Sequence, residues 1–296
     1  MRKKLRLYAA LLTWTASAIA STSESSSNVV YWWRENVPPM YFFDGQRQNQ
    51  GWGDLMQQSL INRIADIQHR EFRSTHSRMY FEAHAGRPLC GLMFKTPERE
   101  TFLNFSLPTT IYPGHRIYFS ENFDSRQIRQ AQQTTGSISL ERLLLSQSSE
   151  LKIGIVQGRS YGKVIDGFIN TYKNQFSLRS GSNSSLSVFR MFIAGRLDAI
   201  IEFPWRFHYQ HDQQNLPTKA KGIYSLVITE ATNYEAGYVA CSQTPAGKRV
   251  IEQVNQDIHS IRSEFAKLLV AWLPKASRIP YLNDSVNYFK SMPSRE

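Results

Sequence analysis

The sequence predicts an α/β protein built from two similar lobes. Apolar strand-like segments alternate along the chain with segments whose apolar residues recur at helical spacing, which is typical of α/β domains. An Ala-Gly-Arg sequence followed by an apolar segment occurs near residue 85 and again near residue 194, which indicates that the two halves share one architecture. The chain has 296 residues, of which 41% are hydrophobic, and this is enough for one large core or two small ones.

The first 27 residues precede this pattern. Four basic residues, at positions 2, 3, 4 and 6, are followed by an apolar run from Leu7 to Ala20 that ends in small residues. The run is short for a membrane anchor, so residues 1–20 are interpreted as a cleaved secretory signal, with an uncleaved anchor helix as the alternative. Residues 21–27 are rich in Ser and are expected to form a flexible leader. The mature protein is therefore expected to be soluble and exported.

The charge and the cysteine content of the chain limit the kinds of function that it can have. The net charge of +11 becomes +7 when the four basic residues of the signal are removed. No run of five or six like charges exists, which argues against a dedicated nucleic-acid surface and fits a protein that meets anionic ligands. The seven His are scattered without metal-ligand spacing, so neither a metal nor a cofactor is predicted. Cys90 and Cys241 are expected either to pair or to be isolated buried thiols.

The first half of the chain opens with a strand at residues 29–33, whose continuous apolar run is typical of a strand buried on both faces. A hairpin-like segment is expected at residues 41–45, where Asp-Gly follows three aromatic residues. Six apolar residues at helical spacing predict a helix within residues 53–67. A strand around residue 72, a helix at residues 79–81 and a strand at residues 89–94 are expected to follow.

The second half begins after a hinge-like strand at residues 115–119 and a polar linker at residues 125–137. The same reasoning predicts four strands and four helices there. The strands are at 151–156, 197–203, 223–228 and 237–241, and the helices are at 163–172, 186–193, 246–258 and 263–273.

An internal repeat relates the two halves. In each half a helix is followed by an Ala-Gly-Arg turn, an apolar strand, a proline and an arginine. The first copy runs from Ala85 to Arg99, and the second runs from Ala194 to Arg206. Two lobes built alike explain this repeat, and a ligand would then lie between them, at the carboxyl ends of the strands.

The segment Thr96-Pro97-Glu98-Arg99, followed by Phe105-Ser106 and Pro108, resembles the signature of type II periplasmic solute-binding proteins of the polar amino acid family. The resemblance extends over most of the mature chain and is greatest to a branch with a Lys-Thr-Pro-Glu-Arg motif. It implies a Venus-flytrap architecture of two Rossmann-like lobes joined by two hinge strands. Lobe 1 is expected to comprise residues 28–117 and 229–296, and lobe 2 to comprise residues 118–228.

The resemblance also implies a function. Such a protein captures a small carboxylate-bearing solute in the periplasm and delivers it to an inner-membrane ABC permease, and we expect a monomer that is not an enzyme. The alternative is a periplasmic sensor that reports its ligand to a membrane receptor without transport. A dehydratase-like enzyme on the same fold is a third possibility, for which Glu35 and Glu202 are the one acid–base pair that the sequence offers.

Three site residues follow from the family motifs. Arg99 is implied to bind the ligand carboxylate through its bidentate guanidinium, the alternative being an exposed arginine paired with Glu98 or Glu100. Ser160 occupies the place of a hydroxyl residue at a helix N-terminus, where it either contacts an anion or caps the helix. Thr96 has the same two possibilities, with local turn bonding favoured.

Two departures from the family concern the ligand ammonium group. Phe94 stands where the family has a hydroxyl residue, and Phe203 stands where it has an aspartate. Glu202 precedes Phe203 by one residue, so it replaces that aspartate only if the strand end is bulged or turned; otherwise it is a solvated or hinge-facing carboxylate. A standard α-amino acid is therefore a doubtful ligand.

Aromatic residues complete the predicted site. Because alternate residues of the first strand face the core, either Trp32 or Trp33 is expected to serve packing only, with Trp33, Glu35 and Tyr161 as ligand-binding candidates. Arg34 is expected to be a solvated loop charge, with a second anion contact as the alternative. Trp205 is expected to pack on the surface at a turn.

Overall fold

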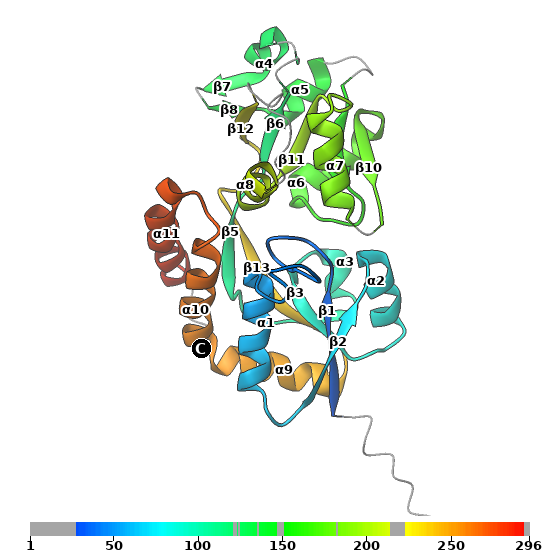
Figure 1. Cartoon of the computed structure of the whole chain (residues 1–296), viewed down its shortest axis with the longest axis vertical. Helices are drawn as coiled ribbons and strands as arrows, with labels where there is room; N and C mark the ends of the chain where they lie inside the picture. Colours follow the sequence, from blue (N-terminus) through cyan, green and yellow to red (C-terminus); the bar gives the residue numbers. More distant parts are fainter. Residues whose placement is uncertain are drawn as a thin grey trace, which may run out of the picture.

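The structure is a computed structural model of the whole chain. It describes residues 28–292 except 121–122, 124, 135, 147–150, 182 and 214–222. The predicted signal and leader, residues 1–27, lie outside the described residues. Two β-sheets form two lobes that are stacked along the long axis of the molecule (Figure 1).

Lobe 1 is built on a six-stranded sheet. Its strand order is β2-β1-β3-β13-β4, with β5 also paired to β13. β1 lies parallel to β2 and β3, whereas β13 runs antiparallel to β3, β4 and β5. The strands are β1 (Val29–Arg34), β2 (Gln68–Arg73), β3 (Leu89–Phe94), β4 (Leu103–Phe105), β5 (Thr110–Pro113) and β13 (Tyr234–Ser242).

Lobe 2 is built on a seven-stranded sheet in the order β10-β9-β11-β6-β12-β8-β7. β9 lies parallel to β10 and β11, and β6 runs antiparallel to β11 and β12. The strands are β6 (Arg116–Phe119), β7 (Gln132–Thr134), β8 (Ser137–Ile138), β9 (Ile153–Val156), β10 (Phe176–Arg179), β11 (Ala199–Glu202) and β12 (Tyr224–Ile228).

The two sheets share one topology. In each sheet the first parallel strand lies between the second and the third, and an antiparallel strand flanks the third, so β2-β1-β3-β13 corresponds to β10-β9-β11-β6. The chain passes from one sheet to the other twice, between β5 and β6 and between β12 and β13. The α/β fold class predicted from the sequence is confirmed, and the repeat found there corresponds to matching elements of the two lobes.

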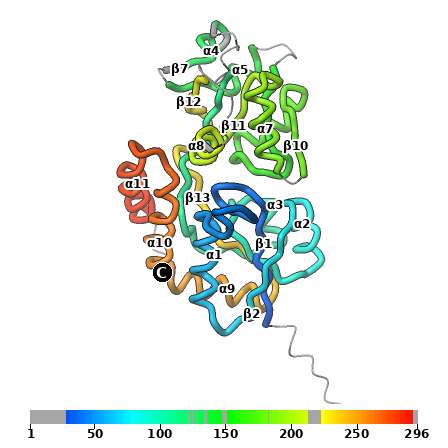
Figure 2. Tube along the Cα trace, viewed as in Figure 1, coloured from blue at the N-terminus to red at the C-terminus, as the bar shows by residue number. Residues whose placement is uncertain are grey.

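Helices cover both sheets (Figure 1). Lobe 1 carries α1 (Trp52–Arg63), α2 (His76–His84), α3 (Pro97–Glu100), α9 (Pro245–Gln256), α10 (Ile258–Val270) and α11 (Arg278–Lys290). Lobe 2 carries α4 (Ser125–Ala131), α5 (Leu140–Ser146), α6 (Lys163–Thr171), α7 (Ser184–Ile193) and α8 (Pro204–Gln213). In the Cα trace α8 lies at the junction of the two lobes (Figure 2). None of the helices in the described part of the chain has the length and apolar character needed to span a membrane.

The Ala-Gly-Arg turns end α2 and α7 in the same way. Gly86 has φ of 83° and Gly195 has φ of 70°, the left-handed region that glycine adopts without steric cost. The Arg87 N–H donates to the carbonyl of Glu82, and the Arg196 N–H donates to the carbonyl of Met191, which satisfies carbonyl groups at each helix end. These turns therefore direct β3 and β11 into corresponding places in their sheets.

Cys90 and Cys241 form a disulfide with an S–S distance of 2.00 Å. They are directly opposed on the antiparallel pair β3 and β13. Because 151 residues separate them along the chain, the disulfide ties the last strand of lobe 1 to the third.

Four details of the sequence prediction are wrong. Residues 41–45 form an irregular loop instead of a hairpin, and α1 ends at Arg63, before the predicted limit. Trp205 is buried at 2% exposure on α8, not on the surface at a turn. Residues 125–134, expected to belong to a polar linker, form α4 and β7. The helices α3, α5, α8 and α11 were also not predicted. Pro204 begins α8, and the helix was missed because a proline after a strand also fits a turn.

Candidate functional site

A cavity of about 80 Å³ lies between the lobes. Lobe 1 contributes the ends of β1 and β3, the loop before α1, and α3, whereas lobe 2 contributes the turn after β9 and the start of α8. These are the carboxyl ends of parallel strands, where α/β proteins bind ligands. The residues that line the cavity are Trp33, Glu35, Val37, Met40, Tyr41, Trp52, His76, Leu92, Met93, Phe94, Arg99, Tyr112, Arg159, Ser160, Phe203, Trp205 and Arg206.

Arg99 is buried at 4% exposure and lines this cavity from lobe 1. Its Nε donates to the Tyr80 hydroxyl at 2.7 Å, and its Nη1 donates to the Phe94 carbonyl at 2.7 Å. Glu98 is exposed, and Glu100 pairs with Lys95 at 2.6 Å, so the alternative of a surface pair with Arg99 is wrong. Within the described part of the chain, no carboxylate forms an ion pair with Arg99.

Thr96 and Ser160 each form a local hydrogen bond within the chain, which was one of the two roles expected for them. The Thr96 hydroxyl accepts from the Arg99 N–H at 3.3 Å and so caps α3. The Ser160 hydroxyl donates to Asp166 at 2.7 Å, at the beginning of α6, while Ser160 also lines the cavity. Thr96 instead lines a second interlobe cavity of about 540 Å³, together with Tyr161 and Asp166.

Tyr161 makes its hydrogen bond within lobe 2. It is 1% exposed, and its hydroxyl accepts from the Val156 N–H at 2.8 Å. Its ring lies 5.0 Å from the His115 ring. Burial raises the pKa of the Tyr161 hydroxyl. The hydroxyl is thus engaged within lobe 2, and Tyr161 does not line the smaller cavity.

Glu202 ends β11 and binds a residue that the sequence prediction missed. Arg159 Nη1 donates to both Glu202 oxygens, at 3.0 and 2.9 Å, and the Phe203 N–H donates to Glu202 as well, at 3.0 Å. Glu202 is 5% exposed, so the alternative of a solvated carboxylate is wrong. Arg159 immediately precedes Ser160, but one charge in a polar turn gives no sign of burial.

Arg206 is the second missed residue, and here the sequence did carry a signal. It is the arginine of the second repeat copy, equivalent to Arg99. Its Nη1 donates to the Ser185 hydroxyl at 3.0 Å and lies 3.9 Å from Glu202, and Arg159 donates to the same hydroxyl. Burial, together with repulsion from Arg159, lowers the pKa of Arg206 to about 10.

Glu35 faces the cavity and pairs with His76, whose Nδ1 lies 2.7 Å from a Glu35 oxygen. Burial raises the pKa of Glu35, but the hydrogen bond and charge of His76, with Arg159 and Arg206 nearby, leave it below its ordinary value. Trp33 also lines the cavity and packs edge-on against His76, whereas Trp32 is fully buried in the lobe 1 core. Among the described residues, no group of three or more His, Cys, Asp or Glu could hold a metal ion.

Aromatic side chains join the lobes beside the charged groups. Phe94 of lobe 1 stacks on Phe203 of lobe 2 at a centroid distance of 5.6 Å, and Trp52 of lobe 1 meets Trp205 of lobe 2 edge-on at 5.1 Å. Phe203 and Trp205 belong to the same buried cluster as the lobe 1 core residues. The first turn of α8 therefore extends the core of lobe 1 into lobe 2, and this packing favours the closed arrangement.

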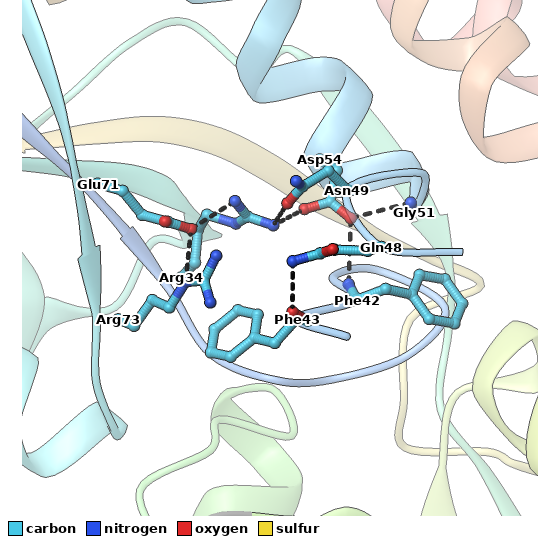
Figure 3. Close-up of polar contacts among 9 residues, drawn as sticks. All are labelled: Arg34, Phe42, Phe43, Gln48, Asn49, Gly51, Asp54, Glu71 and Arg73. Carbon is cyan, nitrogen blue, oxygen red and sulfur yellow. Dashed lines mark hydrogen bonds and ion pairs between the residues drawn. The ribbon is translucent and has the colours of Figure 1, made fainter. Parts of the chain in front are cut away.

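An ion network around Arg34 holds the loop that supplies Met40 and Tyr41 to the cavity (Figure 3). Arg34 pairs with Asp54 on α1 and with Glu71 on β2, and it donates to the Asn49 side chain at 2.9 Å. Asp54 in turn accepts from the N–H groups of Phe42, at 3.1 Å, and Gly51, at 2.9 Å. Arg34 is 8% exposed, so the prediction of a solvated loop charge is wrong.

Comparisons with solved structures identify the fold. The chain is similar to an ancestral amino acid-binding protein, a precursor of cyclohexadienyl dehydratase, with a TM-score of 0.60 and 15% identity over 83% of this chain and 96% of that one. A protein of glutathione import in Streptococcus mutans gives a TM-score of 0.62 at 13% identity, covering 84% and 98%. The periplasmic VFT2 domain of Bordetella pertussis BvgS gives 0.55 at 17% identity, covering 83% and 94%.

The chain thus has the two-lobed Venus-flytrap fold of the type II periplasmic binding proteins, as its resemblance to that family predicted. No family model matches the chain, and no curated protein matches it in sequence.

Replacing Arg34 tests the network that holds the loop. We expect Arg34→Met to lower the free energy of unfolding by about 3 kcal/mol, because it leaves the buried Asp54 carboxylate without its partner. Arg63→Met is the matched control, since the pair of Arg63 with Glu264 is partly exposed and is worth under about 1 kcal/mol. Urea unfolding measures both variants, and equal losses would contradict the assigned role.

Replacing Trp205 tests the aromatic contact between the lobes. We expect Trp205→Ala to lower stability by about 3 kcal/mol and to increase the radius of gyration, because the lobes lose a shared buried side chain. Phe189→Ala removes a comparable side chain from a cluster within lobe 2 and should lower stability alone. Small-angle X-ray scattering separates the two, and an unchanged radius for Trp205→Ala would show that this contact does not hold the lobes together.

Proposed function

We propose that the protein captures a small carboxylate-bearing solute between its two lobes in the periplasm. The observation that carries this proposal is Arg99, a buried guanidinium that faces an interlobe cavity and forms no ion pair with a carboxylate in the described part of the chain, although Asp166 lies within electrostatic range. Its Nε and Nη1 are anchored to lobe 1, which fixes the orientation of the group before a ligand arrives. Anchoring of this kind lowers the entropy lost on binding.

Binding is the activity that the cavity supports, in preference to catalysis. Glu35 and Glu202, the one acid–base pair that the sequence offered for an enzyme, are already engaged, by His76 and by Arg159 respectively. A general acid or base must have a free oxygen within hydrogen-bond reach of the substrate in a productive pose. Glu202 has both oxygens bound by Arg159 and does not line the cavity.

The proposed partner is a membrane protein that recognises the closed lobes. Several solved structures of the same fold are substrate-binding proteins of amino acid ABC transporters, which supports an inner-membrane permease as that partner. The binding protein itself is proposed to act as a monomer. A membrane receptor that reads the same closed state would use the site in the same way.

The proposal is tested by Arg99→Ala in two stages. A thermal-shift screen of the native protein against organic acids, amino acids, polyamines and small peptides first identifies a ligand. Calorimetry should then show that Arg99→Ala weakens its binding by about 2–5 kcal/mol, since the ligand carboxylate would be buried without a partner. Arg99→Lys keeps the charge without the bidentate fork and should retain part of the affinity. Unchanged affinity for Arg99→Ala would refute the proposal.

A further inference from the structure

Arg206 occupies in lobe 2 the place that Arg99 occupies in lobe 1. Each is the third residue of a helix that begins with a proline, α3 or α8, and each of these helices follows the third parallel strand of its sheet. Both side chains line the same cavity, and both residues are 4% exposed. The duplicated architecture therefore directs a guanidinium toward the cavity from each side.

The charge of Arg206 is only partly matched. The nearest carboxylate, Glu202, lies 3.9 Å away, and both of its oxygens accept from Arg159 at shorter distances. Arg206 Nε has no hydrogen-bond partner among the described residues. The same is true of the indole N–H groups of Trp52 and Trp205, which line the cavity beside it. Buried donors without acceptors are costly, so this side of the cavity is suited to a ligand rich in oxygen acceptors.

An ammonium group has no comparable place in the cavity. Three guanidiniums line it, those of Arg99, Arg159 and Arg206, and Glu35 is the one carboxylate among its lining residues. Glu35 is bound to His76 and lies within electrostatic range of Arg159 and Arg206, which would repel an ammonium group placed beside it. The aromatic rings of the cavity could attract a cation, but the three buried guanidiniums oppose this.

We propose that the ligand is an organic acid that carries no ammonium group, with one oxygen-bearing end at Arg99 of lobe 1 and another at Arg206 of lobe 2. The proposal rests on the proposed function, since it names the ligand class of the same site. Oxygens that reach Arg206 supply the acceptor that its Nε lacks, and a ligand held from both lobes stabilises the closed form by mass action.

Three pairs of compounds that differ chiefly in the amino group test the proposal on the native protein. They are 2-oxoglutarate with L-glutamate, succinate with L-aspartate, and phenylpyruvate with L-phenylalanine. In calorimetry we expect the acid without the amino group to bind at least about 10-fold more tightly in every pair that shows binding, because the ammonium is repelled by the lining arginines. Tighter binding of an amino acid, or no binding by any of the three acids, would overturn the ligand class.

Arg206→Gln provides the second measurement. It keeps a polar but shorter, uncharged side chain, and we expect it to weaken binding of the preferred acid by at least about 10-fold. Equal binding by native protein and Arg206→Gln would remove Arg206 from the ligand contacts and so contradict the proposal. If the variant does not fold, the comparison of compound pairs on the native protein decides alone.

The two proposals fail in different ways. An amino acid that binds tightly and depends on Arg99 would refute the ligand class and leave solute capture intact. A ligand that binds equally well to Arg99→Ala would refute the proposed function itself.

Discussion

The region between the lobes buries more positive than negative charge, and this imbalance is the constraint that governs the site. Arg159 and Arg206 share the carboxylate of Glu202 and the hydroxyl of Ser185, while Arg99 faces them from the other lobe without a carboxylate partner among the described residues. Burying a guanidinium is costly unless opposite charge or acceptors compensate it. Glu202 and the nearby Glu35, which is itself paired with His76, compensate the three guanidiniums of Arg99, Arg159 and Arg206 incompletely. In the proposed function a bound anion completes this charge balance, so ligand binding and lobe closure are expected to be coupled.

Apolar packing acts at the same junction. Phe203 and Trp205 pass from the end of β11 into the lobe 1 core, so the residues that flank the buried charges also hold the lobes together. The indole N–H groups of Trp52 and Trp205 and the Nε of Arg206 are buried at this junction and lack hydrogen-bond partners among the described residues. Parting of the lobes would expose both the aromatic faces and these donors, and water would satisfy the donors. The free energies of opening and of ligand entry are therefore linked through a few residues at the start of α8.

Much of the fold could be predicted from the sequence, and less of the site. Apolar periodicity located the central strands of both sheets and several of the helices, because it reflects burial in a sheet or on a helix face. The repeated Ala-Gly-Arg turns indicated the two lobes. The site depends on which distant residues meet. Arg159 and Glu202 are 43 residues apart, and Arg34 and Asp54 are 20 apart, and no local pattern reports such pairing. Arg206 could have been predicted as a site residue from the sequence, because the repeat already matched it to Arg99.

The most direct measurement of the central claim compares the identified acid with its methyl ester at the Arg99 end, by calorimetry on the native protein. Esterification removes the negative charge and adds little volume. The account predicts that the ester binds at least about 30-fold more weakly, since a buried guanidinium would face a neutral group in place of a carboxylate. Equal affinity of the acid and the ester would contradict the claim that this cavity recognises a carboxylate.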